Sequence, residues 1–262
     1  RLFERSRGGV QITAQGEEFV QRAQKILSDV QDLRRAMMSE TVFSGRLRLG
    51  VLPSIGPYLL PQVVKTLHQT HPDLRIIVRE ENTRDLEIGL RSGRLDTIIS
   101  TPEDHPNTIQ KRLFNESLWV AVATDDVLAG LDGPATAQDL MGQRLLTLDN
   151  SHRLSRIVYA LAAQTGGVVT DDYEGTSLDS VLLMAATGSG VAILPELFAR
   201  RQAIYREEVV VKPLDLPNAN RDIALLFRQE DRTGTGQILL TQALRDAANK
   251  FGLKTHHDAD DA

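Results

Sequence analysis

Small polar side chains stand at predicted strand ends and helix starts, where they could hold a small ligand. Ser54 and Ser100 follow predicted strands, and Thr83 begins a predicted helix. Free backbone N–H groups beside hydroxyls favour an anion or another polar ligand. A second interpretation of Thr83, a simple helix N-cap, fits its position equally well.

His152 and Arg153 begin a predicted helix in the second half of the chain. A guanidinium at a helix start opposes the helix dipole, so an acidic group should compensate it. That group is either an anionic ligand, such as a carboxylate, or a neighbouring acid such as Asp149, and a surface ion pair is the commoner arrangement. His152 on its own is most simply a hydrogen-bonded structural histidine.

The sequence lacks the motifs of common enzymes. It contains no GxSxG elbow, no HExxH helix, no Walker loop and no metal-spaced histidine cluster. The chain has no cysteine, which excludes disulfides, thiolate metal sites and thiol redox chemistry. We therefore expect no catalytic residue, no metal and no cofactor.

The composition is that of a globular protein. The chain has 262 residues, of which 41% are hydrophobic and 25% charged, enough for one large or two ordinary domains. No apolar run approaches the ~20 residues that cross a bilayer, and no secretory signal is visible, so we expect a cytoplasmic protein. A net charge of -5 gives no overall nucleic-acid signature, so the local charge pattern matters.

Predicted strands and helices alternate after residue 45. Strands are expected at 46–51, 74–78, 95–99, 144–148, 170–174, 191–194 and 223–227, with helices between most of them and a last helix at 236–251. This alternation is typical of a parallel sheet with crossover helices, whose ligands bind at the carboxyl ends of the strands. Two small α/β lobes of similar pattern predict a cleft between them.

The first 45 residues differ from the rest, because three arginines oppose a single acid before a glycine pair. Thr13 suits a helix N-cap. The helix that follows carries apolar residues at alternating spacings of four and three: Phe19, Ala23, Ile26, Val30, Leu33 and Met37. This 3.5-residue repeat is typical of a coiled-coil seam and predicts a dimerisation helix about 40 Å long. The alternative is an ordinary helix packed on its own domain.

Two separated motifs resemble those of LysR-type transcriptional regulators. Residues 1–17, RLFERSRGGVQITAQGE, are similar to the family's wing and linker-helix start, LFxRxxRxVxLTxAGE, and residues 188–195, GSGVAILP, are similar to GxGVxxLP. The resemblance implies a two-lobed, periplasmic-binding-protein-like α/β regulatory domain behind a long linker helix. It also implies a winged helix-turn-helix whose recognition helix would precede Arg1.

The resemblance further implies how the chain is divided. The expected parts are a wing remnant at 1–13, a linker and dimerisation helix at 14–45, regulatory lobe I at 46–123 and 221–252, regulatory lobe II at 124–220, and a flexible tail at 253–262. Thr124 then falls at the first crossing between lobes. The implied effector-binding residues are Ser54, Thr83, Ser100, Thr124, His152, Arg153, Thr176 and Ser177. Arg1, Arg5 and Arg7 of the wing would contact DNA phosphates.

Three further segments, residues 53–61, 67–72 and 90–96, resemble the peroxide-sensing OxyR branch of the family. In that branch a reactive cysteine follows a histidine. Here Arg153 follows His152, and Ala162 stands where the resolving cysteine would fall. Without either thiol the disulfide switch cannot operate. The resemblance therefore supports a regulatory role and argues against peroxide as the effector.

The predicted function is that of a LysR-family DNA-binding transcriptional regulator with a small-molecule effector, an anion, in the interlobe cleft. The implied partners are promoter DNA, a second copy in a dimer or a tetramer, and RNA polymerase, with no membrane. The alternative is a solute-binding receptor without a DNA-binding role, which shares the bilobal fold. A secretory signal and a monomer would favour that alternative, whereas the heptad helix argues against it.

Overall fold

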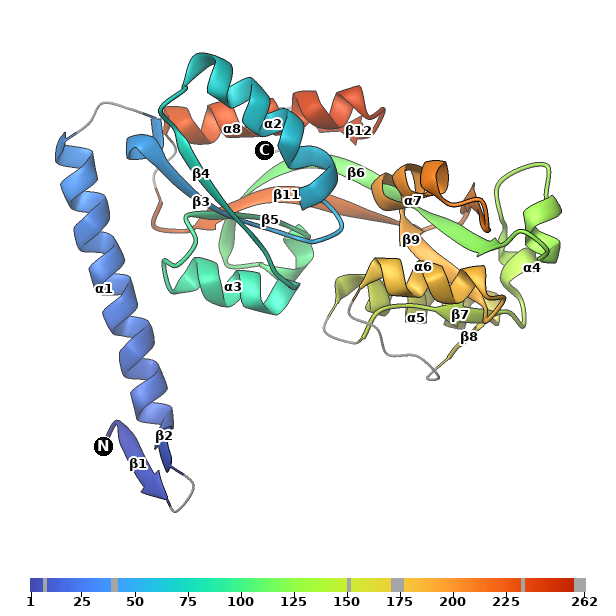
Figure 1. Ribbon diagram of the computed structural model, residues 1–262, viewed down its shortest axis with the longest axis horizontal. Coiled ribbons are helices and arrows are strands. Elements are labelled where there is room, and N and C mark those ends of the chain that lie inside the picture. Colours follow the sequence, from blue (N-terminus) through green and yellow to red (C-terminus); the bar gives the residue numbers. More distant parts are fainter. Residues whose placement is uncertain (7–8, 39–41, 150–151, 171–176, 232–233, 257–262) are drawn as a thin grey trace.

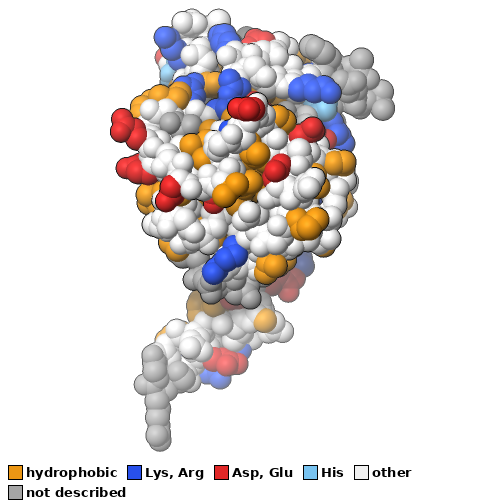
Figure 2. Space-filling model, turned by 90° about the vertical axis from the view of Figure 1, so that its right-hand side faces the viewer, with side chains coloured by type: hydrophobic (Ala, Val, Ile, Leu, Met, Phe, Trp, Pro, Cys, Tyr) orange, Lys and Arg blue, Asp and Glu red, His pale blue; other side chains and the backbone are white. Residues whose placement is uncertain are grey.

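The computed structural model describes residues 1–6, 9–38, 42–149, 152–170, 177–231 and 234–256. A small hairpin and a long helix lead into a two-lobed α/β domain, and the hairpin lies at the end of the helix far from that domain (Figure 1). Seen from the end of lobe II, the domain is a rounded body on which apolar side chains are interspersed with charged and polar ones (Figure 2). Within the part of the chain that is described, no helix is long and apolar enough to cross a membrane.

The hairpin consists of β1 (Phe3–Ser6) and β2 (Gly9–Ile12), which pair antiparallel. Helix α1 (Ala14–Met38) follows, and the backbone N–H of Gly16 donates to Oγ1 of Thr13 over 3.0 Å, so Thr13 caps the helix. The helix is described as far as Met38, residues 39–41 lie outside the described part, and residues 42–45, which were expected to belong to the helix, do not continue it. A short 3-10 turn, η1 (Val42–Gly45), leads into the domain.

Lobe I contains the strands and helices on both sides of lobe II in the sequence. Strand β3 pairs in parallel with β4 and β5, and β11 pairs antiparallel with β5. The elements are β3 (Arg46–Val51), α2 (Gly56–Thr70), β4 (Arg75–Glu80), α3 (Thr83–Arg91), β5 (Thr97–Ser100), η2 (Pro102–Asp104), β11 (Asn220–Arg228), α8 (Thr235–Lys250) and β12 (Lys254–Thr255).

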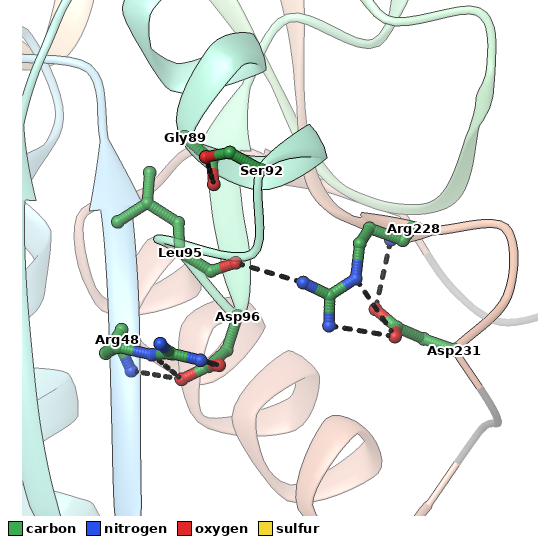
Figure 3. A network of polar contacts seen from close by, with 7 residues as sticks. All are labelled: Arg48, Gly89, Ser92, Leu95, Asp96, Arg228 and Asp231. Atoms are coloured by element: carbon green, nitrogen blue, oxygen red, sulfur yellow. Dashed lines mark hydrogen bonds and ion pairs between the residues drawn. The ribbon is translucent and has the colours of Figure 1, made fainter. Parts of the chain in front are cut away.

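Ion pairs and hydrogen bonds join the loop before β5 to β3 and to the end of β11 in lobe I (Figure 3). Arg48 on β3 pairs with Asp96 ahead of β5, and Arg228 at the end of β11 pairs with Asp231 over 3.1 Å. Arg228 also donates to the carbonyl oxygen of Leu95 over 3.5 Å. These contacts hold the loop between α3 and β5 against two strands that are distant in the sequence.

Lobe II contains the remaining elements. Strand β7 lies between β8 and β9 and pairs in parallel with both. The elements are η3 (Val127–Gly130), α4 (Ala137–Leu140), β7 (Arg144–Leu146), α5 (Arg153–Thr165), β8 (Val168–Val169), α6 (Leu178–Ala186), β9 (Val191–Pro195), α7 (Glu196–Gln202), η4 (Ala203–Tyr205) and β10 (Val209–Pro213). A Cβ at Gly190 would lie 2.5 Å from the carbonyl oxygen of Arg144, so only glycine fits where β9 meets β7.

A single long strand, β6 (Thr108–Ala123), belongs to both lobes. Its first part pairs with β11 and its last part with β9 and β10, which gives the sheet order β4-β3-β5-β11-β6-β9-β7-β8. Leu113 and Phe114 lie in the core of lobe I, whereas Leu118 and Val120 lie in the core of lobe II. The chain therefore first crosses between lobes inside β6, several residues before Thr124.

Two expectations about the chain after residue 165 need correction. A short strand lies at Val168–Val169, ahead of the one expected at 170–174. Thr170 is not in a strand, and residues 171–174 of that expectation lie outside the described part. The tail expected from residue 253 is packed at its start: Leu253 is buried in the lobe I core, and β12 pairs with β6. Apolar burial and main-chain pairing fix these residues in place. The remainder of that expected tail, residues 257–262, lies outside the described part.

Candidate functional site

A cavity of about 290 Å³ lies between the two lobes. Lobe I contributes the turn between β3 and α2, the start of α2, the end of β4 and the start of α3. Lobe II contributes the starts of α5 and α6 and part of α7. The lining residues are Leu52, Pro53, Ser54, Pro57, Tyr58, Glu80, Thr83, Leu148, His152, Arg153, Leu154, Ser177, Leu178, Asp179, Phe198 and Arg221.

The structure brings Ser54, Thr83, His152, Arg153 and Ser177 together around this cavity. They come from four segments spread over more than 120 residues of the chain. Parallel strands end at a common edge of each lobe, and the two edges face one another, so these helix starts and turns converge.

Two other expected site residues, Ser100 and Thr124, do not line the cavity. Ser100 is fully buried, and its Oγ lies 3.0 Å from Nε2 of His105, so its partner is a core histidine. Thr124 is exposed just beyond the end of β6 and does not line the cavity, because the interlobe crossing occurs earlier in that strand. Thr176 lies outside the described residues.

Thr83 is the first residue of α3 and is not its cap. The capping residue is Asn82, whose Oδ1 accepts a hydrogen bond from the backbone N–H of Asp85 over 2.9 Å. An asparagine side chain places its carbonyl oxygen well for this role. The side chain of Thr83 therefore does not cap the helix. It is buried and lines the cavity.

His152 occupies the N-cap position of α5, and its Nδ1 lies 3.4 Å from Oδ1 of Asp149. Arg153 is the first residue of that helix. Its Nη1 lies 3.4 Å from Oδ1 of Asp104, on the other lobe. The acid beside Arg153 is thus Asp104, and the neighbour expected to pair with it, Asp149, contacts His152. Arg156, one turn further along α5, places Nη2 2.6 Å from the same oxygen of Asp104.

A buried ion pair beneath the cavity was not among the expected site residues. Arg221 on β11 donates through Nε and Nη2 to Oε2 of Glu116 on β6 over 2.9 and 2.8 Å, and both side chains are at least 95% buried. Arg221 Nη2 also donates to Oγ of Ser54 over 2.9 Å. The other carboxylate oxygen of Glu116 accepts from the backbone N–H of Leu197 at the start of α7.

The ion pair beneath the cavity lies where the chain crosses between the lobes. Glu116 and Arg221 are register partners on the two strands that connect lobe I with lobe II. A charged pair out of water is retained only when its remaining lone pairs and protons are hydrogen-bonded. The sequence feature that could have revealed this buried pair is the acid Glu116, which stands between the apolar segments Leu113–Phe114 and Leu118–Ala123.

The cavity also holds two acids and a tyrosine. Glu80 ends β4, Asp179 lies in the first turn of α6, and Tyr58 packs edge-on against Phe198 with ring centres 6.0 Å apart. Burial raises the pKa of Tyr58, and the nearby charges of Asp179 and Glu80 raise it further, against a lowering hydrogen bond from Gln202. In the described ranges, no three His, Asp or Glu side chains gather as a metal site would require.

Helix α1 presents a second surface of interest. Phe19, Ile26, Val30 and Leu33 are exposed, as are the adjacent Val20 and Leu27, and Ala23 is half-buried. Met37 lies in the same helix, although its side chain is outside the described part. In the hairpin Arg1 and Arg5 are exposed, whereas Arg7 is outside the described residues. The exposed apolar stripe of α1 therefore includes Val20 and Leu27 as well as the residues expected in the dimer seam.

Comparisons with known proteins agree with this architecture. The family model described as the LysR substrate binding domain matches residues 41–249. The chain belongs to the LysR family of transcriptional regulators, and its two lobes are the effector-binding domain of that family. The fold class and family expected from the sequence are thereby confirmed.

Its relatives include proteins named as peroxide regulators. The hydrogen peroxide-inducible genes activator of Pectobacterium carotovorum subsp. carotovorum is 34% identical over 229 residues, which are 87% of this chain and 75% of that protein. The DNA-binding transcriptional dual regulator OxyR of Escherichia coli K12 is 32% identical over 246 residues, 93% of this chain and 80% of that protein. A cysteine variant of full-length OxyR from Pseudomonas aeruginosa, at 27% identity, has a similar structure with a TM-score of 0.72 over 93% of this chain and 82% of that one.

Proposed function

We propose that this regulator responds to a reversible, non-covalent ligand carrying a negative charge, bound in the interlobe cavity. The observation that supports the proposal is Arg153, which lines the cavity in a chain without cysteines. Its contact with Asp104 spans 3.4 Å and its side chain is about a third exposed, so the guanidinium can turn toward a ligand. A carboxylate matches its planar fork of donors.

Ligand binding would act through the arrangement of the lobes. The cavity is lined by both lobes, so a ligand that contacts both favours one relative position over another. Helix α1 would transmit that change to a paired copy and to the DNA-binding heads on their half-sites. Promoter DNA and RNA polymerase are the macromolecular partners that this role implies, and the cytoplasm is the compartment. Arg1 and Arg5 would contribute phosphate contacts only.

The test is thermal stabilisation by a panel of small carboxylates. A ligand at about 100 times its Kd should stabilise the protein by ~2.7 kcal/mol, which corresponds to a rise in Tm of several degrees. We expect Arg153→Ala to abolish this rise. Arg156→Ala is the matched control, because Arg156 shares Asp104 but does not line the cavity.

Brief exposure to hydrogen peroxide is the second arm of the experiment. We expect no reversible structural change, because sulfoxide formation at methionine is the only sulfur chemistry that the chain offers. A reversible, peroxide-dependent change in the wild-type chain would refute the proposal. A carboxylate response that survives Arg153→Ala would refute the role of this arginine.

A further inference from the structure

The interlobe cavity carries charges of both signs. A second, more polar hollow adjoins the cavity. Arg153 and Arg221 line both, so they lie on the side where the two meet. Glu80 and Asp179 line the same cavity as Tyr58, and Oε1 of Glu80 lies beside Gly56, two residues before that tyrosine. The remaining lining is largely apolar and includes Leu178 and Phe198.

Among the described residues, neither acid is held by a close ion pair, although each lies at a helix start, where the helix dipole offsets part of its charge. The contact of Asp179 is with Arg206 over 3.4 Å, and half of the Asp179 side chain is exposed. Glu80 has no ion pair within the described ranges, and its Oε1 lies over the start of α2, 2.9 Å from where a Cβ at Gly56 would stand. The arginines are better compensated, Arg221 by Glu116 and Arg153 by Asp104, but Arg153 is held loosely.

This charge arrangement restricts the ligand more than Arg153 alone does. A simple carboxylate would be attracted by the arginines but repelled by Glu80 and Asp179. A simple amine would be attracted by the two acids but repelled by the arginines. A molecule with one group of each sign satisfies both sides. The volume of about 290 Å³ lies at the small end of ligand cavities, which suits a molecule of amino-acid size.

We propose that the ligand is a small zwitterion, an amino acid or a related aminocarboxylic acid. Its carboxylate faces Arg153 and Arg221, its ammonium group faces Glu80 and Asp179, and its carbon chain lies against Leu178 and Phe198. This inference rests on the proposed function, because it specifies the ligand of the same cavity.

The experiment uses matched ligands that differ by one charged group. The full 262-residue chain is titrated calorimetrically with the common amino acids and the ω-amino acids of three to six carbons. Each ligand that binds is compared with its deaminated acid and its decarboxylated amine, for example 4-aminobutyrate with butyrate and propylamine. We expect at least one zwitterion to bind at least tenfold more tightly than both of its analogues.

Variants on the acidic side then separate recognition from stability. Glu80→Gln and Asp179→Asn should weaken the zwitterion at least tenfold and strengthen the deaminated acid, whereas a merely structural role would weaken both ligands alike. Arg153→Ala should weaken both ligands. Glu103→Gln is the control, since Glu103 lines only the second hollow, and it should leave the two affinities unchanged.

The outcomes distinguish this inference from the proposal on which it rests. If deaminated acids bind as tightly as their zwitterions and still depend on Arg153, the zwitterion is wrong and the anionic ligand stands. If the decarboxylated amine binds best, the ligand is a cation, and both the zwitterion and the anionic ligand are wrong. If no amino acid and no carboxylate binds, both are overturned.

Discussion

Asp104 and Arg156 form an ion pair between the two lobes, with Oδ1 of the carboxylate 2.6 Å from Nη2 of the guanidinium. Oγ1 of Thr101 donates to the other carboxylate oxygen over 2.7 Å, and the side chain of Asp104 is almost completely buried. The same carboxylate lies beside Arg153, which lines the cavity. One acid of lobe I thus positions the start of α5 in lobe II.

The first prediction concerns this acid. Asp104→Asn should lower the free energy of unfolding by about 1–3 kcal/mol, because charge-assisted hydrogen bonds from two arginines are lost. Arg156→Ala should cost less than about 1 kcal/mol, since more than half of that side chain is in water. Urea unfolding of both variants measures these values. An Arg156→Ala cost equal to that of Asp104→Asn would contradict a shared role for Arg153.

The second prediction concerns the buried pair at the crossing of the lobes. Arg221→Met should destabilise the fold by about 3–5 kcal/mol, because Glu116 would remain buried without its counter-charge. Adding Glu116→Gln should recover part of this loss, since a neutral amide still accepts from the backbone N–H of Leu197. Denaturant unfolding of the two variants decides the matter. A double variant less stable than Arg221→Met would show that the loss does not come from the unpaired carboxylate.

The third prediction is self-association through α1. Ile26→Asp or Leu33→Asp should raise the dimer dissociation constant by two orders of magnitude or more, because burying such a side chain contributes ~1.5–3 kcal/mol and each occurs twice in a dimer. Sedimentation equilibrium measures the constant. Gln24→Asp is the control, as Gln24 is exposed on the same helix but off the apolar stripe. A wild-type chain that stays monomeric at micromolar concentration would contradict the role of α1 in self-association.

The fourth prediction is a pH dependence caused by His105. Burial lowers the pKa of this histidine, and the raising effects of Asp104 and Glu87 are smaller. The unfolded chain therefore binds more protons than the folded one between the folded pKa and ~6.5, so stability falls as pH falls through that window. His105→Gln should lose this slope in urea titrations between pH 5 and 7.5. Ser100→Ala, which removes a hydrogen bond but keeps the imidazole, should retain it.

Local patterns were enough to predict the elements that rest on apolar spacing. Strand β3, the start of helix α5 and strand β9 lie where the sequence placed them, to within a few residues. The predictions that failed depend on contacts between distant residues. Arg153 and Asp104 are 49 residues apart, so no local signal connects them.

Strand β6 shows why the crossing was misplaced. Asn115, Glu116 and Ser117 interrupt its apolar pattern, so the sequence does not show one continuous strand there. The charge of Glu116 is tolerated at that depth because Arg221 compensates it from 105 residues away. The parallel topology was enough to predict that helix starts meet around a cavity. It could not predict that Glu80 and Asp179 line that cavity, since each also suits an ordinary solvent-exposed position.

The insertion of one lobe into the other has a consequence for how the chain folds as it is synthesised. The lobe II core draws on residues between Leu118 and Ala219, whereas lobe I needs β11 and α8, which follow. On the ribosome, lobe II therefore has all of its strands before lobe I can close, reversing the usual order in which the N-terminal unit matures first. Until β11 emerges, β5 and the first part of β6 lack their shared neighbour, and the nascent chain presents unpaired strand edges to chaperones.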